Sequence, residues 1–318
     1  MPNWEEKRLL VKIARMYYEL DMTQNEISKA LGIYRTTISR LLKKAKKEGI
    51  VQIHIDRSFS EVFELEEQLE KAFQLKEVIV VPSNHAQTSE QRRRELGSAT
   101  LQYLNRIMSD QDKVGFAWGK TLASMVDELS EFKPRKADFF PLVGGPGTLD
   151  SKYHVNTIVY NLANAFGGTA HFIDAAAVVE KKETRDDLLA SNFFKKILDL
   201  WNELTIAVVG IGAPLASSNM IWTGFYGEKE IEELDKLKVV GDICSRFIDV
   251  HGNIMRSEIT DRTVAIELER LRELSYSIGV AESLNKVPSI LGALRGKFIN
   301  VLITDEVTAE EIIRQAEE

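Results

Sequence analysis

Three glycine-rich segments could hold an anion or a polyhydroxylated ligand, because glycine lets a backbone approach a bound molecule closely. They lie at residues 115–121, 143–148 and 210–214. In the first, Gly119, Lys120 and Thr121 offer amides, an ammonium group and a hydroxyl at an expected helix start. Each glycine could instead only tighten a turn, but three such loops in one sheet favour a ligand site. None has the spacing of a dinucleotide or ATP loop.

A second set of chemistry-bearing side chains lies between residues 34 and 47, where hydroxyl and cationic groups share one helical face. The residues that would face base edges are Thr36, Thr37 and Arg40, since Arg pairs with guanine and Thr contacts the thymine methyl group. The residues that would contact phosphates are Tyr34, Arg35, Lys43, Lys44 and Lys47. This pattern is typical of a helix that reads the DNA major groove.

The surrounding sequence predicts the helix-turn-helix that such a helix needs. Apolar residues recur at helical spacing over 5–20, and Thr23 with Glu26 forms a capping box that starts a second short helix. Gly32 ends that helix, and the third begins near Tyr34. Residues 49–55 alternate like the strand of a wing. A three-helix module for protein interaction is the alternative.

The distribution of charge favours the DNA-binding interpretation. The whole chain of 318 residues carries a formal charge of -7. Residues 1–57 contain 12 basic and 7 acidic side chains, whereas the remainder contains 29 basic and 41 acidic ones. A basic N-terminal segment before an acidic remainder indicates that the first part meets a polyanion and the second does not.

Residues 58–75 are predicted to form a linker or dimerisation helix between the two parts. Val62, Leu65, Leu69 and Ala72 fall at heptad spacing, with five glutamates outside. Two heptads leave both alternatives open, namely packing within the chain and contact with a second copy.

Residues 76–318 alternate short apolar runs with helical patterns, which predicts a doubly wound α/β domain with a mostly parallel sheet. The expected strands are 78–81, 113–118, 139–143, 204–212, 276–281 and 298–304. The expected helices are 90–108, 120–130, 153–166, 191–202, 228–237, 262–273, 285–295 and 306–317. Ligands of such sheets bind at the carboxyl ends of the strands, where the glycine-rich loops fall.

These residues together resemble the SorC/DeoR-type sugar-binding transcriptional regulators of bacteria, and within them the sorbose-operon branch. The segments that carry the resemblance are 20–24, 31–43, 115–119, 144–146, 153–157, 241–247 and 292–294. They run the length of the chain. The resemblance implies a winged-helix-like DNA-binding domain and an effector domain similar to sugar-phosphate isomerases and deaminases. It also implies a tetramer built as a dimer of dimers.

The family motifs imply a set of effector-binding residues. Gly119, Lys120 and Thr121 would hold a phosphate or terminal hydroxyl. The residues that would line or hydrogen-bond the sugar are Gly144, Gly145, His154, Asn156, Asp242 and Lys286. Without the resemblance, turn capping for Asp242 and solvent exposure for Lys286 are the simpler interpretations. The deoxyribonucleoside branch has a Schiff-base lysine where this chain has Val143, so covalent capture of an aldehyde is not expected.

The sequence therefore predicts a regulator that binds double-stranded operator DNA and responds to L-sorbose, sorbitol or a phosphate of either. A sugar-phosphate isomerase or deaminase with a DNA-binding segment is the enzymatic alternative, and an adaptor with a decayed pocket is a third. We expect no catalytic residues, cofactor or metal, since the five histidines are scattered and Cys244 is alone. No apolar run approaches membrane-helix length, so we expect a cytoplasmic protein.

Overall fold

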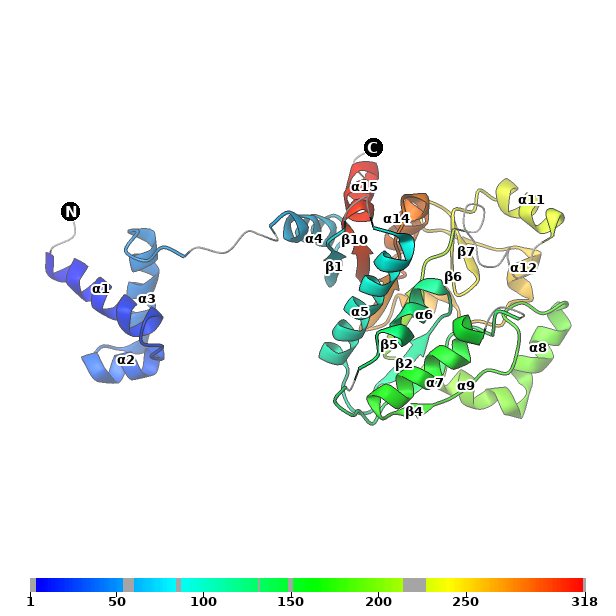
Figure 1. Cartoon of the computed structure of the whole chain (residues 1–318), viewed down its shortest axis with the longest axis horizontal. Helices are drawn as coiled ribbons and strands as arrows, with labels where there is room; N and C mark the ends of the chain where they lie inside the picture. The colour runs from blue at the N-terminus through cyan, green and yellow to red at the C-terminus, as the bar shows by residue number, and fades with distance from the viewer. Residues whose placement is uncertain are drawn as a thin grey trace. The chain divides into compact units, whose positions relative to one another are not determined.

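The computed structural model describes residues 4–53, 60–83, 87–130, 132–147, 151–213 and 227–316. The chain forms two compact units, Met1–Ser58 and Phe59–Glu318, which we call the head and the body (Figure 1).

The head is a helix-turn-helix built on a small apolar core. Its helices are α1 (Trp4–Tyr18), α2 (Gln24–Leu31) and α3 (Arg35–Lys47). The predicted capping box is present, because the Thr23 amide donates to Glu26 Oε2 at 2.8 Å and the Glu26 amide donates to Thr23 Oγ1 at 3.3 Å. Gly32 ends α2 with a left-handed φ of 66°. One residue from each helix, Ile13, Ile27 and Ile38, meets in the core.

The predicted wing strand is wrong over the residues that the structure describes. Residues 49–53 contain no strand, and His54 and Ile55 lie outside the described residues. The amides of Ile50 and Val51 instead donate to the Ala45 carbonyl at the end of α3. Their side chains pack against Leu10 and Ala45. An alternating segment becomes a strand only beside a partner strand, and these apolar residues complete the helical core instead.

The body is built on a seven-stranded sheet in which every pairing is parallel, with the order β1-β10-β9-β5-β2-β3-β4. Its strands are β1 (Glu77–Val81), β2 (Lys113–Phe116), β3 (Asp138–Pro141), β4 (Thr169–Ala170), β5 (Ile206–Gly210), β9 (Tyr276–Val280) and β10 (Val301–Asp305). All six predicted strands are therefore present, and the doubly wound α/β class is confirmed. The short edge strand β4 escaped prediction.

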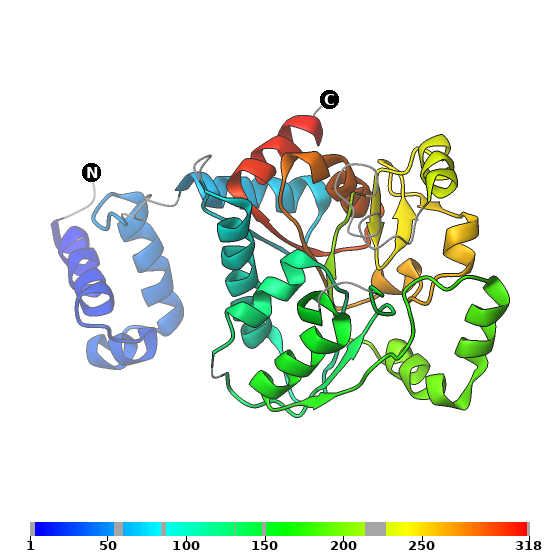
Figure 2. The same cartoon turned by 45° about the vertical axis from the view of Figure 1, so that its right-hand side comes forward.

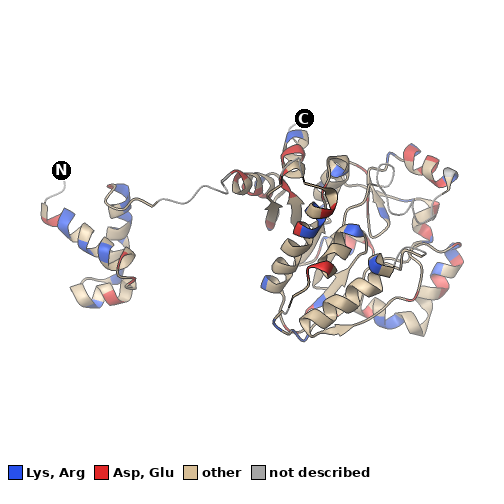
Figure 3. Ribbon diagram, viewed as in Figure 1, with Lys and Arg blue, Asp and Glu red and all other residues tan. Residues whose placement is uncertain are grey.

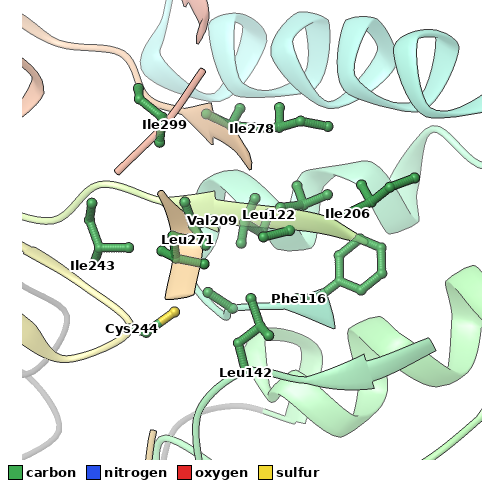
Figure 4. Close-up of a cluster of buried hydrophobic side chains, with 14 of the residues drawn as sticks. Phe116, Leu122, Leu142, Ile206, Val209, Ile243, Cys244, Leu271, Ile278 and Ile299 are labelled. Carbon is green, nitrogen blue, oxygen red and sulfur yellow. The ribbon is translucent and has the colours of Figure 1, made fainter. Parts of the chain in front are cut away.

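Helices cover both faces of this sheet (Figure 2). One layer contains α5 (Ser89–Ile107), α6 (Lys120–Asp127) and α7 (Val155–Phe166), and the other contains α4 (Ser60–Phe73), α14 (Val287–Arg295) and α15 (Glu306–Ala316). The remaining helices are α8 (Lys182–Ala190), α9 (Asn192–Asn202), α11 (Glu228–Lys236), α12 (Glu258–Asp261) and α13 (Leu268–Leu271). Short 3-10 turns occur at η1 (Ser151–Tyr153) and η2 (Leu284–Lys286). Figure 4 shows the apolar core, in which Phe116, Leu142 and Ile206 come from neighbouring strands and loops.

Besides β4 and helix α8, neither of which was predicted, two further regions of the body differ from the sequence prediction. A small antiparallel sheet, β6 (Gly241–Ile243), β7 (Arg246–Ile248) and β8 (Ile254–Met255), was not expected. The single helix expected over 262–273 is wrong, because α12 and α13 are separated by an extended segment. Within that segment, Thr263 bridges Val178 and Ala265 bridges Val143. A short buried apolar run fits either a helix or a strand, and here the bridges decide.

Helix α4 packs on the body rather than standing free. Leu69 is fully buried and Val62 nearly so, while Phe63 on the same helix is 59% exposed. The Glu66 and Glu70 carboxylates each accept a hydrogen bond of 2.9 Å, from the amides of Val80 and Val78 on the edge strand β1. The helical i, i+4 spacing of about 6 Å matches the strand i, i+2 spacing of about 6.6 Å. The apolar heptad positions of α4 therefore pack against the body of the same chain.

Leu69→Ala should lower the free energy of unfolding of the body by about 2–5 kcal/mol, because it removes a side chain from a filled core. Phe63→Ala, on the exposed face of α4, should change it by less than about 0.5 kcal/mol. Urea unfolding followed by tryptophan fluorescence measures both. Equal losses for the two variants would contradict the packing of α4 on the body.

Candidate nucleic-acid interface and ligand site

Helix α3 presents the predicted DNA-contacting residues on its outer face. Ile38, Leu42 and Ala45 point into the head core. Tyr34 is 85% exposed, and the side chains that are also exposed are Arg35, Thr36, Arg40, Lys43 and Lys47. Thr37 is half-buried. Figure 3 shows Lys and Arg residues along α1 and α3, whereas acidic residues gather on α4 and α11 of the body. The arrangement leaves one helical face free for an anionic partner.

Lys44 differs from its neighbours because it already has carboxylate partners. Its ammonium group pairs with Glu6 on α1 and lies 3.6 Å from Glu48. The Glu6 hydrogen bond raises the pKa of Lys44. A DNA phosphate would have to displace these contacts, so Lys44 joins α1 to α3 and is a poorer candidate for a phosphate contact than Lys43.

The candidate ligand loops meet at one edge of the sheet, around the point where strand order reverses. From β2 the chain adds β3 and β4 on one side, whereas β5, β9 and β10 follow on the other. The end of the sheet between β2 and β5 is therefore the expected ligand position in a doubly wound sheet. Gly119–Thr121 follows β2, and the loop containing Gly212 follows β5.

The loop after β2 ends in the first turn of α6. Gly119 has a φ of 137°, a conformation that favours glycine, and stands directly before that turn. The amides of the first turn lack partners within the helix. Thr121 is buried at 8% exposure, whereas Lys120 is exposed. The loop thus combines amides that have no partner within the helix with an exposed ammonium group on Lys120.

The loop after β3 brings Gly145 against His154. A Cβ at Gly145 would lie 2.3 Å from His154 Nε2, so only glycine fits there. His154 caps α7, its Nδ1 accepting from the Asn156 amide at 3.2 Å. Burial lowers the pKa of His154, which favours the neutral ring with Nε2–H as a donor. Gly144 is buried beside Ala176. The Asn156 side chain is occupied, since it bonds the Ile173 backbone at both ends.

The small sheet delivers Asp242 to the loop after β5. Gly212 and Asp242 exchange backbone hydrogen bonds of 2.9 and 3.2 Å. A Cβ at Gly212 would lie 2.0 Å from Asp242 Oδ1, so glycine is required. Burial raises the pKa of Asp242 to about 6, although the Lys286 charge and the Ser245 amide oppose the shift. Burial likewise lowers the pKa of Lys286, against the attraction of Glu282 and Asp242. These two half-buried groups of opposite charge therefore attract each other electrostatically.

The structure groups the candidates into two clusters. Asp242 and Lys286 stand on the β5 and β9 side, and Gly145 with His154 stands beyond β3. Because β2 lies between β5 and β3, its Gly119–Thr121 loop falls between them.

Sequence reasoning missed Glu282, Arg92 and Arg93, which form ion pairs near the carboxyl end of β9. Glu282 is only 6% exposed, two residues after β9. A carboxylate directly after a buried strand was the available signal. Nothing in the helical pattern around Arg92 distinguishes it from a solvated surface.

Cys244 lies in the core rather than at the site (Figure 4). Burial raises the pKa of its thiol, which disfavours the reactive thiolate. Within the described ranges, no group of three or more His, Cys, Asp and Glu side chains could hold a metal ion. None of the helices described is both long and apolar enough to cross a membrane.

Comparison with known proteins agrees with both units. A sugar-binding domain family matches residues 57–314, and a Crp-like helix-turn-helix domain matches residues 7–66. The sorbitol operon regulator of Klebsiella pneumoniae is 40% identical over 316 residues, covering 99% of this chain and 100% of that protein. The chain belongs to the SorC family of transcriptional regulators. This SorC-family chain thus joins a helix-turn-helix head to a sugar-binding body.

Further relatives support the same assignment. The deoxyribonucleoside regulator of Bacillus subtilis is 32% identical over 312 residues, 97% of this chain and 98% of that protein. The crystal structure of full-length SorC from Klebsiella pneumoniae matches this SorC-family chain with a TM-score of 0.77, covering 98% of this chain and 100% of that one. These relatives are named as regulators.

The free energy of unfolding of Asp242→Asn should rise relative to that of the natural protein as the pH increases from about 4 to about 6. Above about pH 6 the difference should stay constant. The reason is that the folded state holds the Asp242 proton more tightly than the unfolded chain, so ionisation costs stability in that window. Thermal unfolding across pH measures it. Asp199→Asn, at an exposed position on α9, controls for net charge. A flat difference across the window would show that Asp242 does not carry this cost.

Proposed function

We propose that the protein regulates an operon for the use of sorbose, sorbitol or a related sugar, and that a sugar or sugar phosphate in the body controls operator binding by the head. The observation that supports this most is the combination of a free basic face on α3 with polar groups gathered at the switch point of the sheet. Effector control needs only about 1–3 kcal/mol of difference in affinity between states.

The head reads the major groove with the N-terminal half of α3. Thr36, Thr37 and Arg40 face base edges, and Tyr34, Arg35, Lys43 and Lys47 contact phosphates. Lys44 serves this face indirectly, through its contact with Glu6.

The body binds its effector between the β2, β3 and β5 loops. Gly119, Lys120 and Thr121 take a phosphate or terminal hydroxyl, and Asp242 and Lys286 take sugar hydroxyls. Gly144 and Gly145 give room, while His154 supplies a neutral donor; Asn156 positions the helix start on which His154 sits. The buried Val143 side chain offers no amine for covalent capture.

We further propose that the active form is a cytoplasmic homotetramer, built as a dimer of dimers, which binds without catalysis. Two-fold related heads suit palindromic half-sites. Light scattering measures the mass directly, and a monomer would contradict this assembly.

Arg40→Ala should weaken binding to a DNA sequence selected from a random pool by about 1–3 kcal/mol, while leaving binding to random DNA nearly unchanged. Lys43→Ala should weaken binding to both DNAs similarly. It should also reduce the slope of log affinity against log salt concentration by about one. Fluorescence anisotropy over a salt series measures both. Lys195→Ala, on the body, is the control. Equal loss on both DNAs for Arg40→Ala would remove Arg40 from base readout.

L-Sorbose, D-sorbitol or a phosphate of either should raise the melting temperature of the body, because a ligand that binds only the native state stabilises it. Fructose and deoxyribose phosphates are the controls. If the effector is phosphorylated, Lys120→Ala should reduce its shift and leave that of a free sugar unchanged. A flat screen would contradict this choice of effector. Product formed from any of these phosphates would contradict the absence of catalysis.

A further inference from the structure

A groove that the proposed function does not use lies in the body between α8, β7 and α12 (Figure 1). Its volume is about 500 Å³, which is in the range of sites that bind small molecules. Met255 and Leu268 contribute apolar side chains to its wall. The cationic side chains that line it come from three separate elements, and they are Lys182, Arg185, Arg246 and Arg256.

Two of these arginines are shielded from solvent and incompletely hydrogen-bonded. The side chain of Arg246 is 8% exposed and that of Arg185 is 22% exposed. Arg246 Nη1 donates to the Thr260 carbonyl at 3.0 Å, and its Nη2 donates to the Ala265 carbonyl at 3.1 Å. The Nε of each arginine is buried and has no hydrogen-bond partner among the described residues. Buried donors without partners are rare in folded proteins and often mark a bound water or ion.

The carboxylate that joins the two arginines belongs to an exposed residue. Glu267 Oε1 lies 2.7 Å from Arg246 Nη2 and 3.7 Å from Arg185 Nη2, although the Glu267 side chain is 60% exposed. In the part of the chain that the structure describes, no other carboxylate lies within 4.0 Å of Arg246. Arg185 has a second partner, Asp186, at 2.9 Å.

The groove therefore keeps its positive charges inside and its negative charges outside. The two other carboxylates that line it, Asp261 and Glu269, are exposed like Glu267. An exposed carboxylate can turn into water at little cost, whereas a buried guanidinium group cannot. If Glu267 turns away, Arg185 and Arg246 present two planar groups of donors to whatever enters, and such groups match the oxygen atoms of a carboxylate or phosphate.

This groove is separate from the candidate ligand site at the end of the main sheet. The pairing of β6 with β7 sets Arg246 opposite Ile243 and Phe247 opposite Asp242. Opposite residues share a face of a sheet and successive residues alternate, so Arg246 and Asp242 lie on opposite faces of the small sheet. Among the described residues, none of the candidate effector-binding residues lines the groove.

We propose that this groove binds a second, small oxyanion, the phosphate or carboxylate group of a metabolite, which replaces Glu267 between Arg185 and Arg246. Glu267 holds the two arginines in place until the ligand arrives and then turns into solvent. The wall of Met255 and Leu268 contacts the carbon skeleton of the ligand. The proposal does not depend on the proposed function, because it uses neither the head nor the ligand loops.

The Met255 methyl group is a local reporter for binding in this groove. Full-length protein is labelled with ¹³C at its seven methionine methyl groups, and the Met255 resonance is assigned through Met255→Leu. Inorganic phosphate and sodium succinate are the probes, each titrated at constant ionic strength against sodium chloride. At least one probe should shift the Met255 resonance in a saturable way. Saturation by phosphate alone identifies a phosphate group as the ligand group, and saturation by succinate alone identifies a carboxylate.

Two substitutions should change the affinity in opposite directions. Arg185→Gln should weaken binding of the probe about tenfold, because one charge-assisted contact is lost. Glu267→Gln should strengthen it about two- to fivefold, because the probe no longer competes with an exposed ion pair. The matched controls are Arg314→Gln and Glu311→Gln, which break an ion pair on α15 and should leave the affinity unchanged.

The opposite signs separate a binding site from a structural ion pair, since damage to the fold would weaken binding in both variants. Three results would overturn the proposal: no saturable shift of Met255 with either probe, unchanged affinity in Arg185→Gln, or weaker binding in Glu267→Gln. The thermal screen with sorbose and sorbitol phosphates is a separate measurement, so failure of this groove leaves the proposed function standing.

Discussion

Parallel pairing is the constraint on which the body depends. A strand can follow its parallel neighbour only after the chain has crossed a face of the sheet and returned, so every carboxyl end falls on one edge. In this chain that edge collects loops that are far apart in sequence, including those that contain Gly119, Gly145 and Gly212. Because β2 and β5 are neighbours from which the chain leaves in opposite directions, the space between their loops is where a doubly wound sheet is expected to bind a ligand. The small antiparallel sheet then adds Asp242 from outside the main sheet.

Placing opposite charges at such an edge has an energetic consequence. Asp242 and Lys286 are both shielded from most of the solvent, so each ion favours the charged form of the other. The pKa of Asp242 is raised and that of Lys286 is lowered, as burial requires. A site of this kind lowers the stability of the folded state, because it keeps charges shielded from solvent where a polar ligand can contact them. The apolar core behind it, from Phe116 to Ile278, supplies the compensating burial.

The sequence predicted the elements with strong periodicity and missed those that depend on tertiary contacts. The capping box of Thr23 and Glu26 is local, so it could be recognised from spacing alone. The segment around Thr263 to Ile266 could not, because its bridges to Val178 and Val143 come from distant parts of the chain. Residues 49–53 failed as a wing for the same reason, since Ala45 supplied hydrogen bonds that no pattern reveals.

The same distinction between local patterns and tertiary contacts applies to the candidate site. Glycines and an ammonium group at a helix start are visible in the sequence, and family motifs added Asp242 and Lys286. Whether a candidate side chain already has a hydrogen-bond or ion-pair partner within the protein cannot be read from the sequence. Only the structure shows that the Asn156 amide is bonded to Ile173, that Lys44 is paired with Glu6, and that Glu282 lies between Arg92 and Arg93.

Helix α4 takes the place of an eighth strand. By accepting the outward amides of Val78 and Val80, Glu66 and Glu70 do for β1 what a neighbouring backbone would do. While α4 remains in place, the body cannot grow by pairing this edge with another molecule. The same contact means that α4, the helix that follows the DNA-binding head, protects the body against aggregation. A body that lacks α4 and begins after Phe73 would expose the amides of an apolar edge strand, which is a template for uncontrolled sheet extension.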